Sequence, residues 1–300
     1  MTKICVLYLG RMGAGNIFTY QMVEALLRKN CCVNLILSSY IENIDRFRSL
    51  KEEYTSLQLK EIKTYKGTRD FLFRTLNIFR FWSMSLYIKK LNPYWVYIPM
   101  VSLWASILSF FLPKSLRIVT TIHDVRLHLG EKNQFVYMVN RHLINKSSKV
   151  VTLTNSFREL IAREYKKNID DICWIEHANF NYYRPNSFQN KRYISRKILF
   201  FGRINRYKGI KILLDAVDNL IQDGMLLTLD IVGNGTFEKD ELKIIEKLGK
   251  SVNVVNRWIK DEEIYTFFED IDYVVVPYIE ASQSGVVMTA YTFGKPVIVT

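Results

Sequence analysis

A short basic loop enclosed by two glycines has the clearest chemical potential in the sequence. Residues 200–209 read FFGRINRYKG, so an apolar run ends at Gly202 and a helical pattern begins at Gly209. Arg203 and Lys208 lie between the two glycines. Backbone N–H groups at a helix N-terminus, combined with two cationic side chains, form an anion site suited to a diphosphate. A solvated basic turn without a ligand is the alternative interpretation of the same residues.

A second loop of this kind follows an apolar run that ends in Pro277. Glu280 comes shortly after it, and Ser284 and Gly285 precede a helix of small residues predicted over 286–293. The free N–H groups at this helix start would also bind an anion, and the Glu280 carboxylate is a natural acceptor for sugar hydroxyls. If both loops follow strands of one parallel sheet, they flank a single ligand.

The elements that must position these loops alternate between strand and helix. In the second half, apolar runs predict strands over 198–201, 226–232, 252–255 and 273–276. The segments between them predict helices over 209–221, 238–248 and 262–268. Such alternation predicts a parallel sheet with right-handed crossovers.

The first half opens in the same way. An apolar run over 4–9 precedes a loop that contains Gly13 and Gly15, and a helix is predicted over 17–28. Further segments predict strands over 33–37, 95–98, 117–122 and 150–153, and helices over 101–111 and 155–165. Doubly wound sheets bind ligands at the carboxyl ends of their strands. We therefore predict two α/β domains, 1–190 and 191–300, with the boundary in the polar, aromatic stretch 180–196.

These motifs resemble the retaining glycosyltransferases of family 4. The second half carries the resemblance through Phe201-Gly202-Arg203…Lys208-Gly209, Ile231-Val232-Gly233-Asn234-Gly235 and Pro277…Glu280…Gly294-Lys295-Pro296-Val297. The first half resembles the family more weakly, through the loop at 13–15 and through Thr121-Ile122-His123-Asp124. The run His123-Asp124…His128-Leu129-Gly130-Glu131 is similar to that of bacterial polysaccharide and lipopolysaccharide members. The resemblance implies a GT-B fold, in which two Rossmann-like domains face a cleft.

The resemblance also implies roles for the matched residues. His123 would hydrogen-bond a hydroxyl of the reacting sugar, and Glu280 would orient the donor sugar, so these two are the implied catalytic residues. The residues implied to hold the donor diphosphate are Arg203, Lys208, Ser284 and Gly285. The residues implied to bring loops close to the nucleotide are Gly233, Asn234, Gly13 and Gly15.

One departure from the family pattern concerns its two glutamates, which are spaced eight residues apart. Ala281 and Thr289 occupy those positions here, and Glu280 lies one residue before the first of them. A subset of the family is similar in carrying Ala-Ser-Gln-Ser-Gly at 281–285. We therefore interpret the change as variation rather than as loss of function.

The cations and N–H groups also bear on the need for a metal ion. Preorganised charges of this kind stabilise a leaving diphosphate without a metal. Asp270-Ile271-Asp272 has the spacing of a metal-binding motif, but it lies at the amino end of a predicted strand, opposite the ligand face. We predict no metal site and no cofactor, with a nucleotide sugar such as a UDP- or GDP-sugar as co-substrate. The resemblance implies front-face attack by the acceptor hydroxyl, with retention.

The net charge of +13 predicts an anionic partner. Residues 1–195 contain 29 Lys and Arg against 14 Asp and Glu, whereas the remainder contains 13 and 15. Residues 60–90 interleave eight basic with five Phe and Trp side chains in an expected helical run, which favours contact with an anionic membrane. The alternative is a helix that packs its aromatic side chains into the core. Single-stranded nucleic acid would use the same residue types, but no nucleic-acid fold is recognisable, so we predict no nucleic-acid partner.

Cysteine spacing and the N-terminus bear on the compartment. The four cysteines show no C-x-x-C spacing, and the first residues lack the long apolar core of a signal peptide. Pro99 interrupts the most apolar stretch, 95–112, which favours a strand and a helix over a membrane span. These features predict a cytoplasmic protein. The lipid-linked acceptors of similar enzymes place it at the inner face of the plasma membrane.

The sequence thus predicts a metal-independent hexosyltransferase. It would transfer a sugar from a nucleotide sugar to a saccharide or lipid-linked saccharide in cell-surface polysaccharide synthesis. A non-catalytic nucleotide-sugar-binding or membrane-associated protein is the alternative, because the chain ends at Thr300 after a predicted strand and the resemblance implies further βα units. On that view the second domain is incomplete through C-terminal truncation. An epimerase on a similar cleft is disfavoured, since its acidic catalytic residues cannot be placed.

Overall fold

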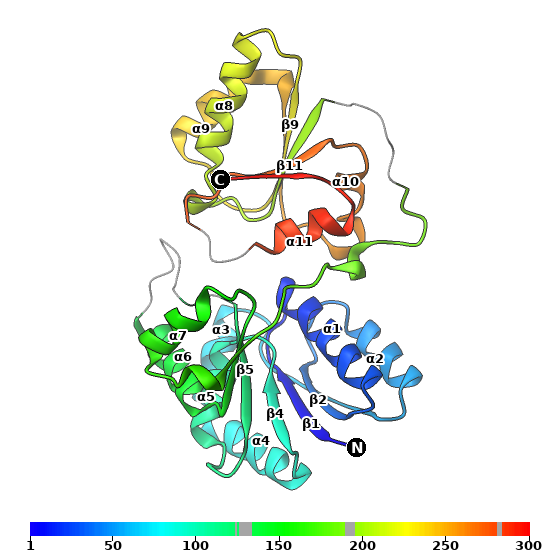
Figure 1. Ribbon diagram of the computed structural model, residues 1–300, viewed down its shortest axis with the longest axis vertical. Coiled ribbons are helices and arrows are strands. Elements are labelled where there is room, and N and C mark those ends of the chain that lie inside the picture. Colours follow the sequence, from blue (N-terminus) through cyan, green and yellow to red (C-terminus); the bar gives the residue numbers. More distant parts are fainter. Residues whose placement is uncertain (124, 126–133, 190–195, 281–283) are drawn as a thin grey trace. The chain divides into compact units, whose positions relative to one another are not determined.

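The computed structural model describes residues 1–123, 125, 134–189, 196–280 and 284–300. The chain divides into two units, the first ending at Glu176 and the second beginning at His177 (Figure 1). Each unit contains one parallel sheet with helices on both faces.

The first unit is built on a seven-stranded sheet of order β3-β2-β1-β4-β5-β6-β7, in which every neighbouring pair is parallel. The strands are β1 (Lys3–Tyr8), β2 (Cys32–Ser38), β3 (Leu57–Ile62), β4 (Trp95–Ile98), β5 (Ile118–Ile122), β6 (Lys149–Thr152) and β7 (Ile172–Trp174). Central strands of such a sheet are buried on both faces, which explains the continuous apolar runs. Along β1, for example, Cys5 and Leu7 enter one core and Val6 and Tyr8 the other.

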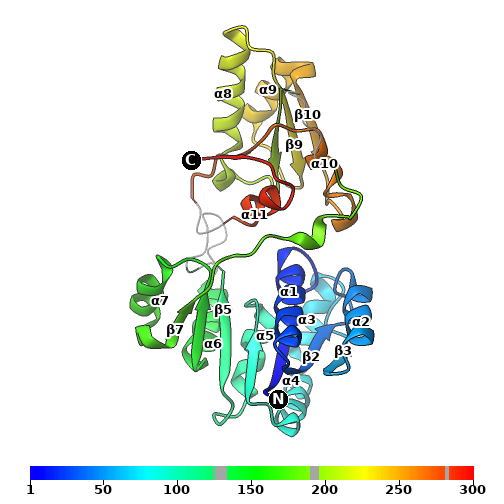
Figure 2. The ribbon, with the colours of Figure 1, turned by 45° about the vertical axis from the view of Figure 1, so that its right-hand side comes forward.

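Helices cover both faces of this sheet (Figure 2). They are α1 (Ala14–Arg28), α2 (Ile44–Glu53), α3 (Thr68–Leu76), α4 (Ile78–Leu91), α5 (Leu103–Phe111), α6 (Gln134–Lys146) and α7 (Phe157–Tyr165). One core contains Val23 of α1 and Phe47 of α2, and the opposite core contains Phe81 of α4, Trp104 of α5 and Leu143 of α6. A short 3₁₀ helix, η1 (Ile169–Asp171), precedes β7.

The second unit has a five-stranded parallel sheet of order β10-β9-β8-β11-β12. The strands are β8 (Lys197–Phe201), β9 (Thr228–Gly233), β10 (Val252–Asn256), β11 (Tyr273–Val276) and β12 (Val297–Val299). The helices are α8 (Ile210–Gln222), α9 (Lys239–Leu248), α10 (Thr266–Glu269) and α11 (Gly285–Thr292), with 3₁₀ turns η2 (Asn181–Tyr183), η3 (Arg206–Lys208), η4 (Gly249–Ser251) and η5 (Asp261–Glu263). Leu214 of α8 lies in the core of one face, whereas Phe268 of α10 and Ala290 of α11 lie in the core of the other.

The predicted alternation of strands and helices is confirmed, with three differences. The helical run expected over residues 60–90 is wrong at its start, because Lys60 lies in β3 and two helices, α3 and α4, follow. Strands β3 and β7 were not predicted; both are sheet edges, where partial exposure removes the continuous apolar run. The helix predicted over 262–268 is a 3₁₀ turn followed by the single turn of α10.

Residues 177–189 belong with the second unit, although the predicted boundary at 190/191 lies further along the chain. The ring of Phe188 packs 5.0 Å from that of Phe293, centroid to centroid, within the core of the second sheet. The Arg184 guanidinium donates to the Thr292 carbonyl at the end of α11. Because this segment is largely polar, its sequence does not indicate that its residues pack on the second sheet.

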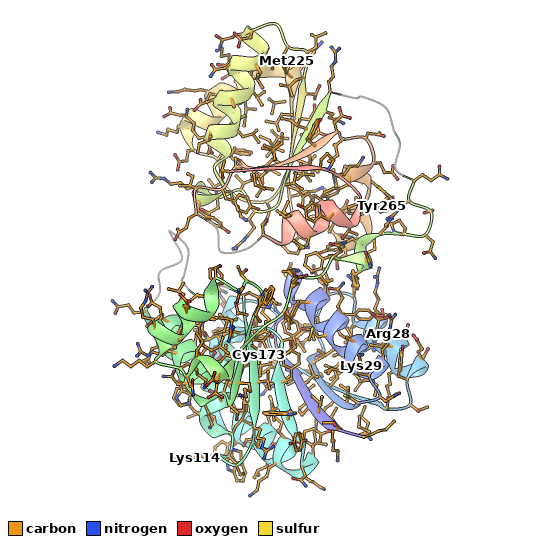
Figure 3. All side chains as sticks on the ribbon, in the orientation of Figure 1. Arg28, Lys29, Lys114, Cys173, Met225 and Tyr265 are labelled. Carbon is orange, nitrogen blue, oxygen red and sulfur yellow. The ribbon has the colours of Figure 1, made fainter. Side chains whose placement is uncertain are left out.

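The described helices include none that combines the length and apolar character needed to cross a bilayer. All four cysteines, each within the described residues, are free thiols; Cys173 is exposed on β7 (Figure 3), and burial raises the pKa of Cys5 to about 12.

Substitution of Trp104 tests how much the core beneath α4, α5 and α6 contributes to stability. Its ring lies 5.2 Å from that of Phe81, its indole N–H donates to Thr75 Oγ1 at 2.9 Å, and only 1% of it is exposed. We expect Trp104→Ala to lower the free energy of unfolding by about 3–5 kcal/mol, through lost burial and a residual cavity. Trp82, 55% exposed on α4, is the control, and Trp82→Ala should change stability by less than about 0.5 kcal/mol. Urea unfolding followed by circular dichroism measures both, and equal losses would contradict the prediction.

Candidate functional site

The strand order of the second sheet reverses between β8 and β11. A crevice forms outside the carboxyl ends of a doubly wound sheet at such a point, and ligands bind there. The loop that follows β8 contains Arg203 and Lys208, and the loop that follows β11 contains Glu280. The two loops selected from the sequence therefore meet at one edge of one sheet.

Backbone contacts join these two loops directly. The Ile279 N–H donates to the Tyr207 carbonyl at 2.8 Å. Gly209 has a φ of +69°, and a Cβ built on it would lie 1.8 Å from the Pro277 carbonyl oxygen. A side chain is therefore excluded at this position by backbone conformation and by space.

Two tyrosines connect the predicted anion-binding side chains. Lys208 Nζ lies 3.6 Å from the ring centroid of Tyr278, a cation–π contact. The Ser284 hydroxyl donates to the Tyr278 hydroxyl at 3.3 Å, and Arg203 Nη2 donates to the Tyr207 hydroxyl at the same distance. The structure thus brings Arg203, Lys208 and Ser284 to one aromatic pair.

Tyr278 contacts two of the predicted site residues, Lys208 and Ser284, and the sequence analysis did not select it. Its side chain is buried, which raises the pKa of its phenol to about 12 and keeps the ring neutral at physiological pH. The available signal was its position directly after Pro277, but its contact with Lys208 joins loops that are far apart in the sequence.

Helix α11 begins at Gly285, as its predicted anion-binding role requires. Within the described residues, the Ser284 side chain makes no capping hydrogen bond to this helix, because its hydroxyl is directed to Tyr278. The Ser284 hydroxyl therefore does not occupy the N–H groups of the first turn, of which that of Val287 donates to the Ser284 carbonyl at 3.2 Å. Thr289, at the position of the second family glutamate, is buried and donates to the Gly285 carbonyl at 2.8 Å. Residues 281–283, including Ala281, lie outside the described residues.

The remaining predicted residues of the second unit lie around the same edge. Glu280 is half-buried beside Ile279. A Cβ on Gly233 would lie 1.8 Å from the Gly202 carbonyl oxygen, so close packing of two loops is sufficient reason for that glycine. Asn234 is exposed, and its carbonyl accepts from the Ile204 N–H at 2.9 Å.

His123 belongs to the first unit, directly after β5. Its Nε2 lies 3.0 Å from the Pro99 carbonyl oxygen, and its ring meets that of Phe18 edge to face at 4.7 Å. A hollow of about 180 Å³ adjoins the imidazole and is lined also by Met100, Val125, Asn140 and Tyr165. Asp124 and the predicted run from His128 to Glu131 lie outside the described residues.

The glycine loop of the first unit precedes α1. Gly15 is buried, and a Cβ there would lie 2.5 Å from Met100 Sδ. The Gly13 N–H donates to Glu42 Oε2 at 3.4 Å. A carboxylate therefore lies at the N-terminus of α1, where the helix dipole favours negative charge. An anionic ligand at this loop would have to accommodate Glu42.

The Asp270–Asp272 motif precedes β11, at the amino edge of the sheet as predicted. Asp272 Oδ2 accepts from the Arg196 backbone N–H at 2.6 Å. Across the described residues, no group of three His, Cys, Asp or Glu side chains is arranged to hold a metal ion.

Comparison with known proteins connects this geometry to a family. Residues 195–300 match the family model described as Glycosyl transferases group 1. Protein CapJ of Staphylococcus aureus is 20% identical over 282 residues, which cover 88% of this chain and 68% of CapJ. Sucrose-phosphate synthase of Thermosynechococcus elongatus is similar in structure, with a TM-score of 0.70, 18% identity, and coverage of 100% of this chain and 81% of that one. Anabaena Alr3699/HepE, in complex with UDP and glucose, is also similar in structure, with a TM-score of 0.65 and 17% identity. The match covers 100% of this chain and 80% of that one. The predicted GT-B fold is confirmed, and the family match covers the second sheet and its loops.

Gly209 provides a test of the loop contact. We expect Gly209→Ala to lower the free energy of unfolding by about 3 kcal/mol, because left-handed strain adds to overlap with Pro277. Gly224 is the matched control, since its φ is +86° but no atom lies within 4 Å of the added Cβ. Gly224→Ala should cost only the strain, about 1 kcal/mol. Urea denaturation compares the two, and equal costs would show that the Pro277 contact is not restrictive.

Tyr278 provides a test of the cation–π contact. Calorimetric titration with UDP and GDP should show that Tyr278→Leu weakens binding about tenfold, since Lys208 loses its aromatic support. Tyr278→Phe keeps the ring and removes only the hydroxyl, so its affinity should stay within about threefold of the unchanged chain. Equal losses for Phe and Leu would assign the effect to the hydroxyl instead.

Proposed function

We propose that this chain is a glycosyltransferase that moves a sugar from a nucleotide-sugar donor to a saccharide or lipid-linked saccharide. The observation that carries the proposal is the cluster of Arg203, Lys208 and Ser284 around two tyrosines, at the strand-order reversal of a sheet that matches the group 1 family model. The UDP complex of a protein with the same fold supports a nucleotide sugar as donor.

The chemistry follows from the charges around the crevice. As the bond between the anomeric carbon and the diphosphate oxygen breaks, negative charge accumulates on the diphosphate. The Arg203 and Lys208 cations and the first N–H groups of α11 stabilise that charge, and they need no reorganisation because the tyrosines already hold the side chains. We propose that this occurs without a metal ion.

Retention of configuration is part of the proposal and is supported by the resemblance to family 4. The acceptor hydroxyl attacks on the face that the diphosphate leaves, its oxygen bonds to the anomeric carbon, and its proton passes to the leaving phosphate oxygen. Glu280 orients the donor sugar. We propose that His123, whose Nε2 contacts the Pro99 carbonyl, hydrogen-bonds a hydroxyl of the donor sugar. Gly13, Gly15, Gly233 and Asn234 are proposed to shape the nucleotide-binding loops.

We place the reaction in cell-surface polysaccharide synthesis, at the inner face of the plasma membrane. Support comes from the basic excess in residues 1–195 and from exposed apolar side chains on α3 and α4, among them Phe73 and Phe79. Such a surface fits peripheral contact with an anionic membrane.

The decisive experiment measures nucleoside-diphosphate affinity by calorimetry. Arg203→Ala and Lys208→Ala should each weaken UDP or GDP binding by about tenfold or more, because each removes a charge-assisted contact to phosphate. Lys250→Ala, which removes an exposed cation at η4, should leave the affinity unchanged. Unchanged affinity for both site variants would overturn the proposal. Binding of a full panel of nucleotide sugars without turnover would instead support the non-catalytic alternative.

A further inference from the structure

Helices α3 and α4 expose an unusual number of large apolar side chains. Those exposed are Leu72, Phe73, Leu76, Ile78, Phe79, Trp82 and Leu86, which we call the apolar ridge. Phe73 and Leu76 are each 78% exposed and Phe79 is 81% exposed. Large apolar side chains exposed together on two successive helices indicate a binding surface.

A hollow of about 370 Å³ lies beside the ridge, between α4 and the edge of the sheet. The α4 residues that line it, Arg80, Ser83, Met84 and Tyr87, follow helical spacing and form one face of the helix. Phe79 of the apolar ridge also lines the hollow, so the two features are continuous.

The hollow contains two cations whose neighbours are aromatic. Lys60 Nζ, from β3, lies 3.3 Å from the ring centroid of Tyr87. The Arg80 guanidinium lies 5.7 Å from the Trp104 ring and donates to the Lys63 carbonyl. Within the described residues, neither cation forms an ion pair with a carboxylate.

The acidic side chains of this region are engaged elsewhere. Glu61 accepts two hydrogen bonds from Arg48, both at 2.8 Å. Asp70 accepts from Arg74 at 2.5 Å and from the Lys66 N–H at 2.8 Å. Burial, and to a smaller extent the charge of Arg74, lower the pKa of Arg80, against the opposing effects of Asp70 and Tyr40. Among the residues that the structure describes, the two cations of the hollow thus have no carboxylate in an ion pair with them.

We propose that this hollow binds the phosphate of an anionic membrane lipid while the apolar ridge enters the interfacial layer of the bilayer. A lipid is the ligand that presents a phosphate and hydrocarbon side by side, as the hollow and the ridge require. Residues 60–90 contain eight basic and two acidic side chains, so the surroundings complement an anionic surface. The inference rests on the proposed membrane contact and is independent of sugar transfer.

The test uses the full chain and sedimentation with vesicles of phosphatidylcholine, alone or with one-third phosphatidylglycerol. Lys60→Gln/Arg80→Gln should weaken binding to the anionic vesicles by about tenfold more than the control Lys89→Gln/Lys90→Gln, although both remove two charges. The control cations are exposed at the end of α4, outside the lining of the hollow. Equal losses would mean diffuse attraction and would overturn the phosphate site.

A second pair of variants keeps both cations. Ser83→Asp adds a carboxylate to the hollow, and Ser49→Asp adds one to an exposed position on α2. Ser83→Asp should abolish the preference for anionic vesicles, whereas Ser49→Asp should reduce it by less than about threefold. Equal reductions would overturn the proposal, as would binding of inorganic phosphate without any binding of vesicles.

Calorimetry with UDP separates this inference from the proposed function. Lys60→Gln/Arg80→Gln should leave UDP affinity unchanged. Both residues belong to the first unit, whereas the cluster of Arg203, Lys208 and Ser284 belongs to the second. If the unchanged chain binds vesicles but no nucleoside diphosphate, the proposed transfer activity fails and the lipid site stands. The converse result would remove the lipid site alone.

Discussion

The reversal of strand order between β8 and β11 is the constraint on which the candidate site depends. Parallel strands with right-handed crossovers place every strand-to-helix loop at one edge of the sheet. Where the strand order reverses, the loops that follow the neighbouring strands β8 and β11 diverge to opposite sides. Arg203 and Lys208 reach the crevice from one side and Ser284 and Gly285 from the other. No local property of either loop brings about this meeting.

The close approach of Gly209 to Pro277 joins the two loops. Because the two backbones touch, Tyr207 and Tyr278 lie close enough for their ring centroids to be 6.4 Å apart. Lys208 is then held over the aromatic face of Tyr278, with its Nζ 3.6 Å from the ring centroid. Apolar and backbone contacts thus hold the two loops together, and preorganisation of this kind favours stabilisation of a leaving anion in the transfer that we propose.

Charge and apolar surface are distributed differently in the two units. The second unit is close to neutral and concentrates a few cations at one crevice. The first unit has most of the excess charge and exposes the apolar ridge beside Lys60 and Arg80. We propose a different kind of anion binding for each unit. In the second unit it uses backbone N–H groups and cations at strand ends, and in the first unit a cationic hollow beside exposed apolar side chains.

Much of this protein was readable from the sequence because the relevant signals are local. Continuous apolar runs identified the central strands, so the fold class followed directly. The glycines and cations of residues 202–209 lie within one loop, so the sequence was sufficient to predict an anion site there. Edge strand β3 could not be predicted from the sequence, because a partly exposed strand has no continuous apolar run. Lys60, which lies in β3, was therefore assigned to a helix. Tyr278 and the hollow beside Arg80 depend on contacts between distant segments, which periodicity does not encode. The sequence determined which chemical groups are present and in which elements they lie; tertiary packing alone decided which cations meet an aromatic ring, which acids are already paired, and which apolar side chains stay outside the core.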